Sequence, residues 1–182
     1  MEGSTVVDDL QSWLAECYPQ SVRTAYLILG NRLDAEDAVQ ESFLRAWKFR
    51  DSLSKESSFK PWLYRVVVNT CNSKLRHDIP RREGRVNDVN LVDIASFDDL
   101  PGRIALSNDV MSALRDLPVH LRVVVVLRYY ADLSEREIAI AIARKQGTVK
   151  SRLNEARTRL ALHPALKSET SRVSAASKEV NG

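Results

Sequence analysis

The last third of the chain carries the start signals of two helices separated by a short charged turn. Ser134 and Glu137 have the spacing of a capping box, in which each side chain binds a backbone N–H group at the start of a helix. Apolar residues continue at helical spacing only as far as Ile142, and the charged run that ends at Gly147 predicts a sharp turn. A second helix is expected to begin at Gly147 or Thr148. This pattern predicts a helix-turn-helix.

The second helix of this pair has two faces of different chemistry. One face is apolar and can pack on the first helix, through Val149, Leu153, Ala156 and Leu160. The other face combines short polar groups with cations, in the residues Ser151, Asn154, Glu155 and Thr158, flanked by Lys150, Arg152, Arg157 and Arg159. Such a face suits the major groove of DNA. The alternative is an ordinary surface hairpin whose charged face is solvated.

Helical periodicity over the N-terminal half predicts four more helices. They are expected over 10–17, from Pro19 to a stop at Gly30, from a cap at Asp34 to about Arg50, and from about Phe59 to Arg76. The run of three valines at 66–68 would also suit a strand. We favour a helix there, because polar residues fall on the face opposite the apolar one.

The apolar residues between 104 and 130 predict the start of a second helical module. A helix over 104–117 is expected to be followed by one that Pro118 restarts and that continues to Tyr130. Residues 123–127 are apolar all round, which indicates a buried helix at the centre of this module. We therefore predict an all-α fold of two small helical domains joined by an extended acidic linker.

Charge is segregated along the chain although the formal net charge is only +3. Residues 60–86 hold seven cations and two carboxylates, and residues 134–160 hold seven cations and three carboxylates. Between them, residues 87–109 hold five aspartates and one arginine. Two basic modules joined by an acidic tether can bind a nucleic acid at two places, because each basic module releases counterions from the polyanion.

The chain lacks the residues that several functional classes of protein need. Cys17 and Cys71 have no partner cysteine at close spacing and the three histidines are scattered, so we expect no metal site and no cofactor. The start of the chain lacks the features of a signal peptide, and no apolar run is long enough for a membrane span, so we expect a cytosolic protein without membrane insertion. No carboxylate cluster or nucleophile with a nearby base indicates an enzyme.

Three motifs together resemble the extracytoplasmic-function (ECF) sigma factors, the smallest class of the bacterial sigma-70 family. The stretch 34–47 is similar to the family's polymerase-binding helix, and 59–70 to its −10 promoter-reading helix. Leu117-Pro118, Leu133-Ser134 and the stretch 147–152 look like its region 4. The resemblance implies a region 2 domain over 7–78, a linker over 79–103, a region 4 domain over 104–163, and no catalytic activity. Residues 164–182 are poor in large apolar residues, so we expect a disordered tail there.

The resemblance also implies partners. Core RNA polymerase would be contacted through its β′ coiled coil and β flap, and promoter DNA both as duplex and as single strand. An anti-sigma factor would hold the protein inactive. The implied polymerase-binding residues are Asp37, Gln40, Glu41 and Arg45. Acidic residues near a helix start also arise simply because they suit the helix dipole, which is the alternative for this patch.

For the −10 element, the resemblance implies a specificity loop over 51–58 that captures an unstacked base, and a helix that holds the backbone. The implied −10 residues are Ser57, Ser58, Lys60, Arg65, Asn69, Ser73, Lys74 and Arg76. Opening a promoter requires cations for phosphate together with polar or aromatic groups at a loop–helix junction. For Phe59 and Trp62 we favour core packing over base stacking, because aromatic residues at helical spacing usually bury.

For the −35 element, the implied residues are Arg128, Lys145, Thr148, Lys150, Ser151, Arg152, Asn154 and Glu155. The cations would mostly meet phosphate, and Asn154 or Glu155 could read base edges. Many family members have a basic or aromatic pair where this chain has Asn154-Glu155, so the promoter preference cannot be copied from relatives.

The interpretation as a sigma factor has an alternative for the role of the linker and an alternative for the function of the whole chain. The acidic linker would thread the polymerase cleft by resemblance, but its composition equally suits a solvated tether. The rival function is a stand-alone helix-turn-helix regulator, which would bind duplex DNA tightly without polymerase.

Overall fold

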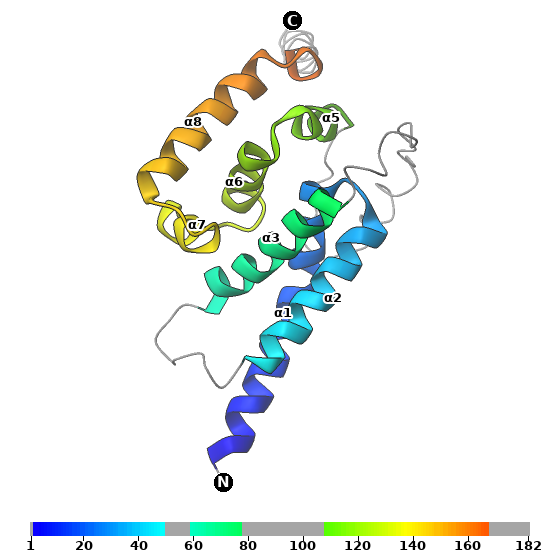
Figure 1. The fold of residues 1–182 in the computed structure, drawn as a ribbon, viewed down its shortest axis with the longest axis vertical. Coiled ribbons are helices and arrows are strands. Elements are labelled where there is room, and N and C mark those ends of the chain that lie inside the picture. The colour runs from blue at the N-terminus through cyan, green and yellow to red at the C-terminus, as the bar shows by residue number, and fades with distance from the viewer. Residues whose placement is uncertain (1, 50–58, 78–107, 168–182) are drawn as a thin grey trace, which may run out of the picture.

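A computed structural model describes residues 2–49, 59–77 and 108–167 of the chain, and in α1 the side chains from residue 12 onward. The described residues form helices and no strands, which confirms the all-α prediction (Figure 1). The first lobe consists of α1 (Glu2–Leu29), α2 (Arg32–Lys48) and α3 (Phe59–His77). The second lobe consists of α5 (Asn108–Asp116), α6 (Val119–Tyr129), α7 (Glu135–Ala141) and α8 (Gln146–Leu162).

The first helix is continuous where two were expected. Pro19 lies inside α1, which runs without a break from Glu2, ahead of the predicted domain start at residue 7. The prediction of separate helices meeting at Pro19 was therefore wrong. A proline inside a helix removes one hydrogen bond. Packing offsets this loss, because Leu14 before the proline and Val22 after it are buried in the same core.

The start of α2 differs from the prediction by one turn. Asn31 caps the helix, because its side-chain oxygen accepts a hydrogen bond of 3.0 Å from the backbone N–H of Asp34. Asp34, the predicted cap, therefore lies inside the first turn. Gly30 joins α1 to α2 with a φ of +77°, a conformation that glycine adopts without strain. The predicted stop at Gly30 is confirmed.

The three helices of the first lobe pack on one another through small and aliphatic residues. Ile28, Val39 and Leu63 are fully buried, one from each helix. Ser42 of α2 donates a hydrogen bond to Ala38 O at 2.6 Å, and also contacts Thr70 Oγ1 of α3 at 3.2 Å. The valine run at 66–68 is helical, as predicted, and two of its three residues are buried.

Aromatic residues close the end of this lobe where α3 begins. Phe59 contacts Trp13 edge-on, with ring centroids 4.3 Å apart, and its centroid lies 5.5 Å from that of Trp62. All three rings pack against the core while staying partly exposed. The preference for core packing of Phe59 and Trp62 agrees with this placement.

The second lobe is built around α6, as its apolar sequence predicts. Every residue from Leu121 to Leu127 is buried, and α7 and α8 pack around this helix. Pro118 occupies the N-cap of α6. α8 ends at Leu162, and after the extended residue His163 the residues 164–167 form a separate helical turn, in which His163 O accepts from the backbone N–H groups of Leu166 and Lys167. The predicted disordered tail therefore cannot begin at 164.

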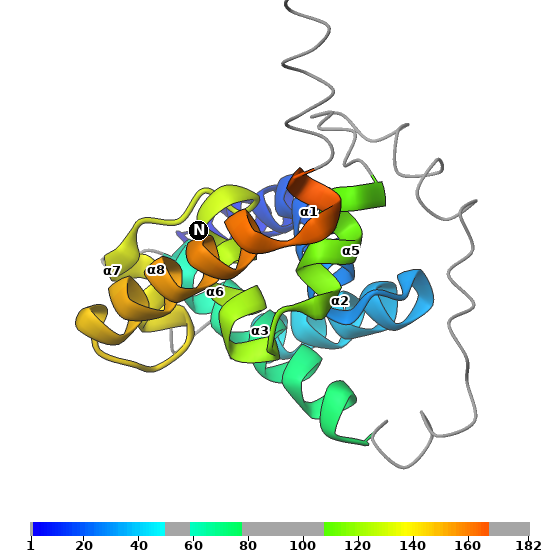
Figure 2. The ribbon, with the colours of Figure 1, turned by 90° about the horizontal axis from the view of Figure 1, so that it is seen from above.

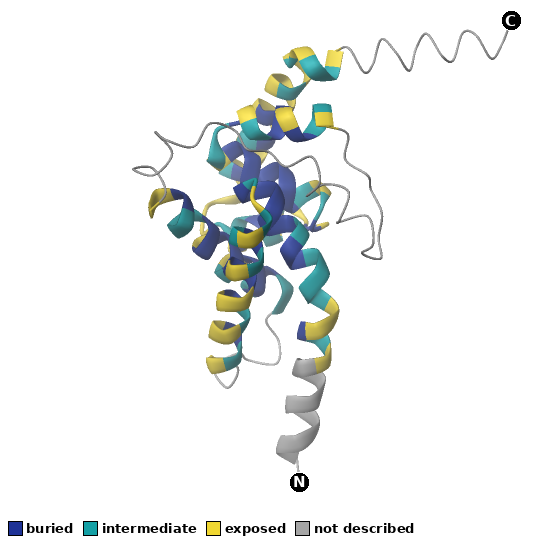
Figure 3. Ribbon diagram, turned by 90° about the vertical axis from the view of Figure 1, so that its right-hand side faces the viewer, coloured by how far each residue is buried: buried dark blue, intermediate teal, exposed yellow. Residues whose placement is uncertain are grey.

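The two lobes pack against each other and share one continuous hydrophobic core. α7 lies against α3, and α5 and α6 lie against α1 (Figures 1 and 2). Buried residues accordingly concentrate in the middle of the molecule, and exposed residues line the outer helix faces (Figure 3). The charge pattern of the sequence indicated two basic modules joined by an acidic tether, and it did not predict that the two lobes would contact each other.

Some predictions fall on residues outside the described ranges. These are the specificity loop over 51–58 with Ser57 and Ser58, the acidic linker over 79–103, the start of the second module over 104–107, and the tail from residue 168. Among the described residues, no helix combines the length and apolar character that a bilayer crossing requires.

Candidate nucleic-acid interface

The helix-turn-helix begins with the predicted capping box. Ser134 Oγ accepts from the Glu137 N–H at 3.3 Å, and Glu137 Oε2 accepts from the Ser134 N–H at 2.8 Å and from the Ser134 hydroxyl at 2.7 Å. These hydrogen bonds from the side chain and backbone of Ser134 hold the pKa of Glu137 below its ordinary value. The box fixes the first turn of α7 and therefore the position of the turn that follows.

The turn between α7 and α8 is not made by the glycine. Ala143 has the left-handed backbone conformation, with a φ of +51°, whereas Gly147 lies inside α8 without a positive φ. A Cβ atom added to Gly147 would meet no atom within 4 Å, so nothing in the described residues requires glycine there. The prediction of a glycine turn was wrong, because a non-glycine residue adopted the strained conformation instead.

The helix α8 has the two faces that the sequence predicts. Val149, Leu153 and Ala156 are buried against the rest of the lobe. The outward residues are exposed, namely Lys145, Lys150, Ser151, Asn154, Glu155 and Thr158. Thr148 and Arg152 lie half-buried at the edge of this face. The structure therefore gathers most of the predicted −35 residues on one exposed surface.

Arg128, a member of the predicted −35 set, forms a hydrogen bond within the protein. Its side chain is half-buried, and its Nη1 donates to Leu133 O at 2.9 Å, across the loop that leads into α7. This hydrogen bond supports the backbone just before the capping box. In this conformation Arg128 fixes the loop between α6 and α7.

Three further residues contact the outward face or its supports, namely Tyr129, Arg157 and Arg159, and the predicted −35 set omits all three. Arg157 Nε donates to the Tyr129 hydroxyl at 2.9 Å, and its Nη1 lies 3.3 Å from Asn154 Oδ1. Glu155 pairs with Arg159 at 3.0 Å. The three-residue spacing of Asn154 and Arg157 could have signalled their contact. The role of Tyr129 depends on how α6 meets α8, which local sequence does not encode.

A second cationic face runs along α3. Arg65, Asn69 and Arg76 are exposed at helical spacing on this face, and Ser73 is half-buried between them. Arg76 donates to Asn72 O at 3.2 Å and contacts Ser73 Oγ at 3.4 Å. These residues form one surface that a phosphate backbone can follow.

Lys60 and Lys74 lie apart from that surface. Lys74 Nζ lies 3.7 Å from Asp37 Oδ2 of α2, which links the predicted −10 set to the predicted polymerase patch. Lys60 is half-buried and lies within electrostatic range of Glu137 in the second lobe. The structure therefore groups only part of the predicted −10 set.

The predicted polymerase-binding residues share an exposed face of α2. Asp37, Gln40, Glu41 and Arg45 are all exposed, and Arg45 donates to Glu41 one turn away. Leu44 adds an exposed apolar side chain to this face. Leu44 was not among the residues predicted from the sequence, because a single leucine between charged residues gives no signal of a contact surface.

The geometry defines a class of protein. A capped helix-turn-helix with an exposed polar and cationic second helix, and a separate cationic helix face on another lobe, define a helical protein with two surfaces suited to DNA. Comparison with known proteins narrows this class. The family models sigma-70 region 2 and sigma-70 region 4 match residues 13–78 and 107–160.

Curated relatives of this chain are ECF sigma factors. The chain is 32% identical to the ECF RNA polymerase sigma factor SigW of Bacillus subtilis over 145 residues, which cover 74% of this chain and 78% of SigW. It is 34% identical to the ECF sigma factor SigE of Mycolicibacterium smegmatis over 146 residues, 76% of this chain, but spans only 54% of that relative's length. The chain belongs to the ECF sigma factors of the sigma-70 family, which confirms the resemblance.

A solved structure shares the fold as well. The sigma factor RpoE of Bartonella quintana, crystallised with the anti-sigma factor NepR, superposes with a TM-score of 0.66 at 25% identity. The match covers 87% of this chain and 97% of that one. The arrangement of helices over both lobes therefore follows a known sigma factor.

Loss of the capping box should be measurable as a pH-dependent loss of stability. We expect Ser134→Ala to lower the free energy of unfolding by about 1 kcal/mol at neutral pH. Because the folded pKa of Glu137 is lowered, its share of this stability is present above the unfolded pKa and is lost as the pH falls through the folded pKa.

Urea unfolding at pH 7 and at pH 3 tests this expectation. The difference between wild type and Ser134→Ala should be smaller at pH 3. Ser151→Ala, an exposed serine inside α8, is the matched control and should change stability little at either pH. A Ser134→Ala effect of equal size at both values would show that the ionised Glu137 contributes nothing through the box.

Proposed function

We propose that this chain is a promoter-specificity subunit of bacterial RNA polymerase, which directs the core enzyme to particular promoters and initiates transcription without chemistry of its own. Membership of the ECF family supports this function. The observation that carries it is the pairing of two separate DNA-facing surfaces, the outward face of α8 and the cationic face of α3, in one chain. A stand-alone regulator would need only the first.

Binding with and without the core enzyme separates the two functions. Purified protein is mixed with a promoter fragment in the presence or absence of core polymerase, and complexes are resolved by gel shift. The sigma function predicts sequence-specific complexes and run-off transcripts only with core polymerase. Tight and specific duplex binding by the chain alone, with no transcripts, would favour the stand-alone regulator.

At the −35 element we propose that α8 enters the major groove. Lys145, Lys150 and Arg152 would meet phosphate, and Ser151, Asn154 and Glu155 would face base edges. Thr148 and Arg128 border the same surface. The pairs Asn154–Arg157 and Glu155–Arg159 support this assignment, because each holds a base-facing side chain beside a cation before DNA arrives.

Two substitutions on α8 should have different consequences for −35 binding. Lys150→Ala should weaken binding to every sequence about equally and lower the salt slope by about one, since one phosphate contact is lost. Glu155→Ala should instead change the preferred sequence, because a carboxylate accepts from cytosine N4. Selection from randomised −35 elements at two salt concentrations measures both effects.

Thr158→Ala is the control for these two substitutions. It lies on the same exposed side of α8 but outside the proposed contact set. An unchanged sequence preference in Glu155→Ala, or an unchanged salt slope in Lys150→Ala, would contradict the corresponding role.

At the −10 element we propose that the exposed face of α3 holds the non-template strand. Arg65, Asn69, Ser73 and Arg76 line this face, and Lys60, Lys74, Ser57 and Ser58 complete the proposed set. Cations that follow the backbone, next to groups that can accept an unstacked base, are what strand capture requires. The exposed array on α3 supports this role.

We propose that the α2 face docks on the β′ coiled coil of the polymerase, and that the second lobe contacts the β flap. Asp37, Gln40, Glu41 and Arg45 surround Leu44, so the face offers an apolar contact within a polar rim. This arrangement is typical of a protein interface. An anti-sigma factor is a further proposed partner, and its support is the RpoE–NepR complex of the structural relative.

A further inference from the structure

Two hydrogen bonds in series join α6 to the outward face of α8. The hydroxyl oxygen of Tyr129, the last residue of α6, accepts a hydrogen bond of 2.9 Å from Arg157 Nε. Arg157 Nη1 in turn donates to Asn154 Oδ1 at 3.3 Å. Tyr129 is 51% exposed, and both α8 residues are exposed as well. The two bonds therefore lie at the surface of the lobe and end on a residue that we propose to face base edges.

The bond to Tyr129 is the one that fixes the arginine. Two residues three positions apart on an exposed helix interact weakly, so Asn154 by itself places little constraint on the Arg157 side chain. Tyr129 comes from a different helix, 28 residues away in the sequence, and its ring has only two rotatable side-chain bonds. Because a guanidinium is planar and rigid, holding Nε at the tyrosine hydroxyl also restricts the direction in which Nη1 donates.

Arg157 then determines which way round the Asn154 amide lies. A guanidinium has N–H donors and no acceptor, so the amide atom that faces it must be the oxygen. The Nδ2 amino group of Asn154 is consequently directed away from Arg157. An asparagine without such a neighbour turns its terminal amide easily, because that torsion is only weakly restricted. The two bonds therefore present Asn154 to a ligand mainly as a hydrogen-bond donor.

Base edges in the major groove differ in what they offer to a donor. Guanine presents N7 and O6, adenine presents N7 and thymine presents O4, all of which are acceptors, whereas cytosine presents only its N4 amino group. An Asn154 amide that is fixed as a donor favours the first three bases over cytosine on the strand that it contacts. The neighbouring Glu155 has the opposite chemistry, because an ionised carboxylate only accepts.

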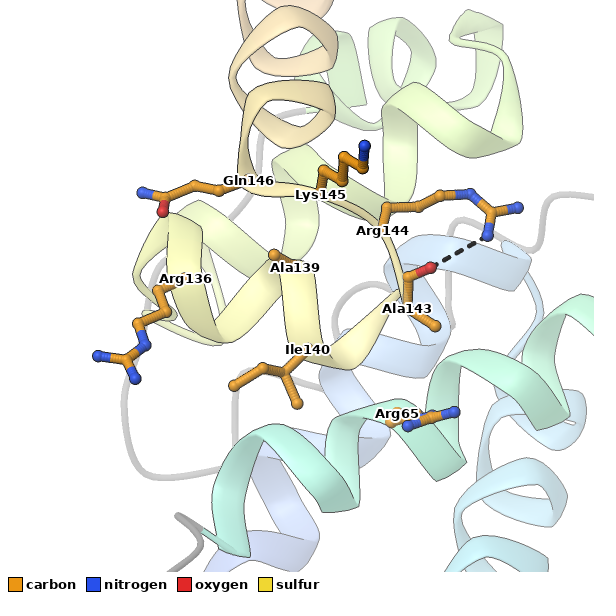
Figure 4. A pocket seen from close by; sticks show the side chains of 8 residues that line it. All are labelled: Arg65, Arg136, Ala139, Ile140, Ala143, Arg144, Lys145 and Gln146. Atoms are coloured by element: carbon orange, nitrogen blue, oxygen red, sulfur yellow. Dashed lines mark hydrogen bonds between the residues drawn. The ribbon is translucent and has the colours of Figure 1, made fainter.

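The polar residues at the N-terminal end of α8 are arranged differently. The side chains of Arg136, Lys145 and Gln146 point away from one another around the pocket at the α7–α8 turn (Figure 4). Arg144 Nη1 donates at 3.0 Å to the backbone carbonyl of the preceding residue (Figure 4). These placements give no base-facing group a fixed donor or acceptor direction, in contrast to Asn154.

We propose that Tyr129 is a positioning residue for −35 recognition, which acts through Arg157 to present the Asn154 amino group to a base with an acceptor in the major groove. This inference rests on the proposed function, because it states what one part of the −35 surface recognises. Tyr129 acts here without touching DNA. Removal of its hydroxyl should therefore change one base preference without a general loss of binding.

Tyr129→Phe removes the hydroxyl and keeps the ring. Holoenzyme made from the full chain and core polymerase selects bound fragments from a library with a randomised −35 element. We expect the ratio of cytosine to the other three bases at one position to rise about threefold in Tyr129→Phe, which corresponds to the loss of one hydrogen bond. Tyr130→Phe loses a hydroxyl at the next position and is the matched control, so it should leave this ratio unchanged.

A double variant shows whether the effect passes through Asn154. Asn154→Ala has no amide to orient, so adding Tyr129→Phe to it should change the cytosine ratio no further. A further rise in the double variant would overturn the proposal, as would an unchanged ratio in Tyr129→Phe or an equal rise in Tyr130→Phe. Selection of no −35 motif by the wild-type holoenzyme would instead contradict the proposed function, and this inference with it.

NMR of the full chain without DNA or polymerase measures the contact itself. We expect the Arg157 Nε–H group to exchange with water about threefold more slowly in wild type than in Tyr129→Phe, because the hydroxyl protects it. This measurement does not depend on the sigma function. Equal exchange rates in the two proteins would overturn the positioning role, whatever sequences the holoenzyme selects.

Discussion

Replacing Arg122 with methionine should lower the free energy of unfolding by about 3 to 5 kcal/mol, more than any surface substitution in this chain, because each hydrogen bond to a charged group contributes about 1.5 to 3 kcal/mol. Arg122 donates to carbonyls of α1, of α5 and of the turn before α6. Methionine fills a similar volume without a donor, so three carbonyls, two in buried hydrogen bonds and one in a part-buried hydrogen bond, lose their charged partner. Urea unfolding followed by circular dichroism measures the loss.

Arg32→Met is the matched control for Arg122→Met. Arg32 forms an ion pair of 2.8 Å with Glu36 on the surface of α2. A pair so exposed contributes about 0 to 1 kcal/mol. Similar destabilisation by the two substitutions would mean that Arg122 does not join the lobes in solution.

Shortening Leu153 to alanine should destabilise the protein by about 2 to 5 kcal/mol, because the side chain is fully buried and leaves a cavity. Leu153 holds α8 against the rest of the second lobe, so the outward face should lose its fixed orientation. We therefore expect −35 affinity to fall together with stability. Thermal unfolding and −35 binding by the holoenzyme measure the two effects.

Leu162→Ala tests whether the loss of stability expected for Leu153→Ala comes from the burial of the side chain, rather than from replacing any leucine in α8. Leu162 lies in the same helix but is 63% exposed. Its replacement should change stability by no more than about 0.5 kcal/mol. If Leu153→Ala were as mild, the packing of α8 described here would be wrong.

Local signals predicted the helix-turn-helix well. The capping box depends on two residues three positions apart, and the buried centre of α6 follows from an uninterrupted apolar run. The outward face of α8 likewise follows from helical spacing alone. Such features need no knowledge of the rest of the chain, which is why the sequence was sufficient for them.

Features that depend on packing were missed. Pro19 was expected to start a helix, but the core that buries both halves of α1 keeps the helix continuous. The turn before α8 was expected at Gly147 and is made by Ala143. Ile140 lies within the apolar run that continues to Ile142 at helical spacing, yet its side chain is 45% exposed.

The candidate sites show the same difference between features set by local sequence and features set by packing. Residues of one helix face, such as Arg65 and Asn69, are grouped correctly by spacing. Lys60 and Arg128 were assigned to DNA by resemblance, and the structure gives each a neighbour that its own helix does not supply. Arg122 drew no attention in the sequence, because its partner Ile28 lies 94 residues away.

The most direct test of the sigma function is run-off transcription with purified core polymerase and a library of genomic fragments. A sigma function predicts transcripts from a subset of fragments that share −35 and −10 sequences, only when this chain is added. We further expect Lys150→Ala to lower transcription from all of them. Absence of chain-dependent transcripts, although the chain binds the core enzyme, would contradict the sigma function.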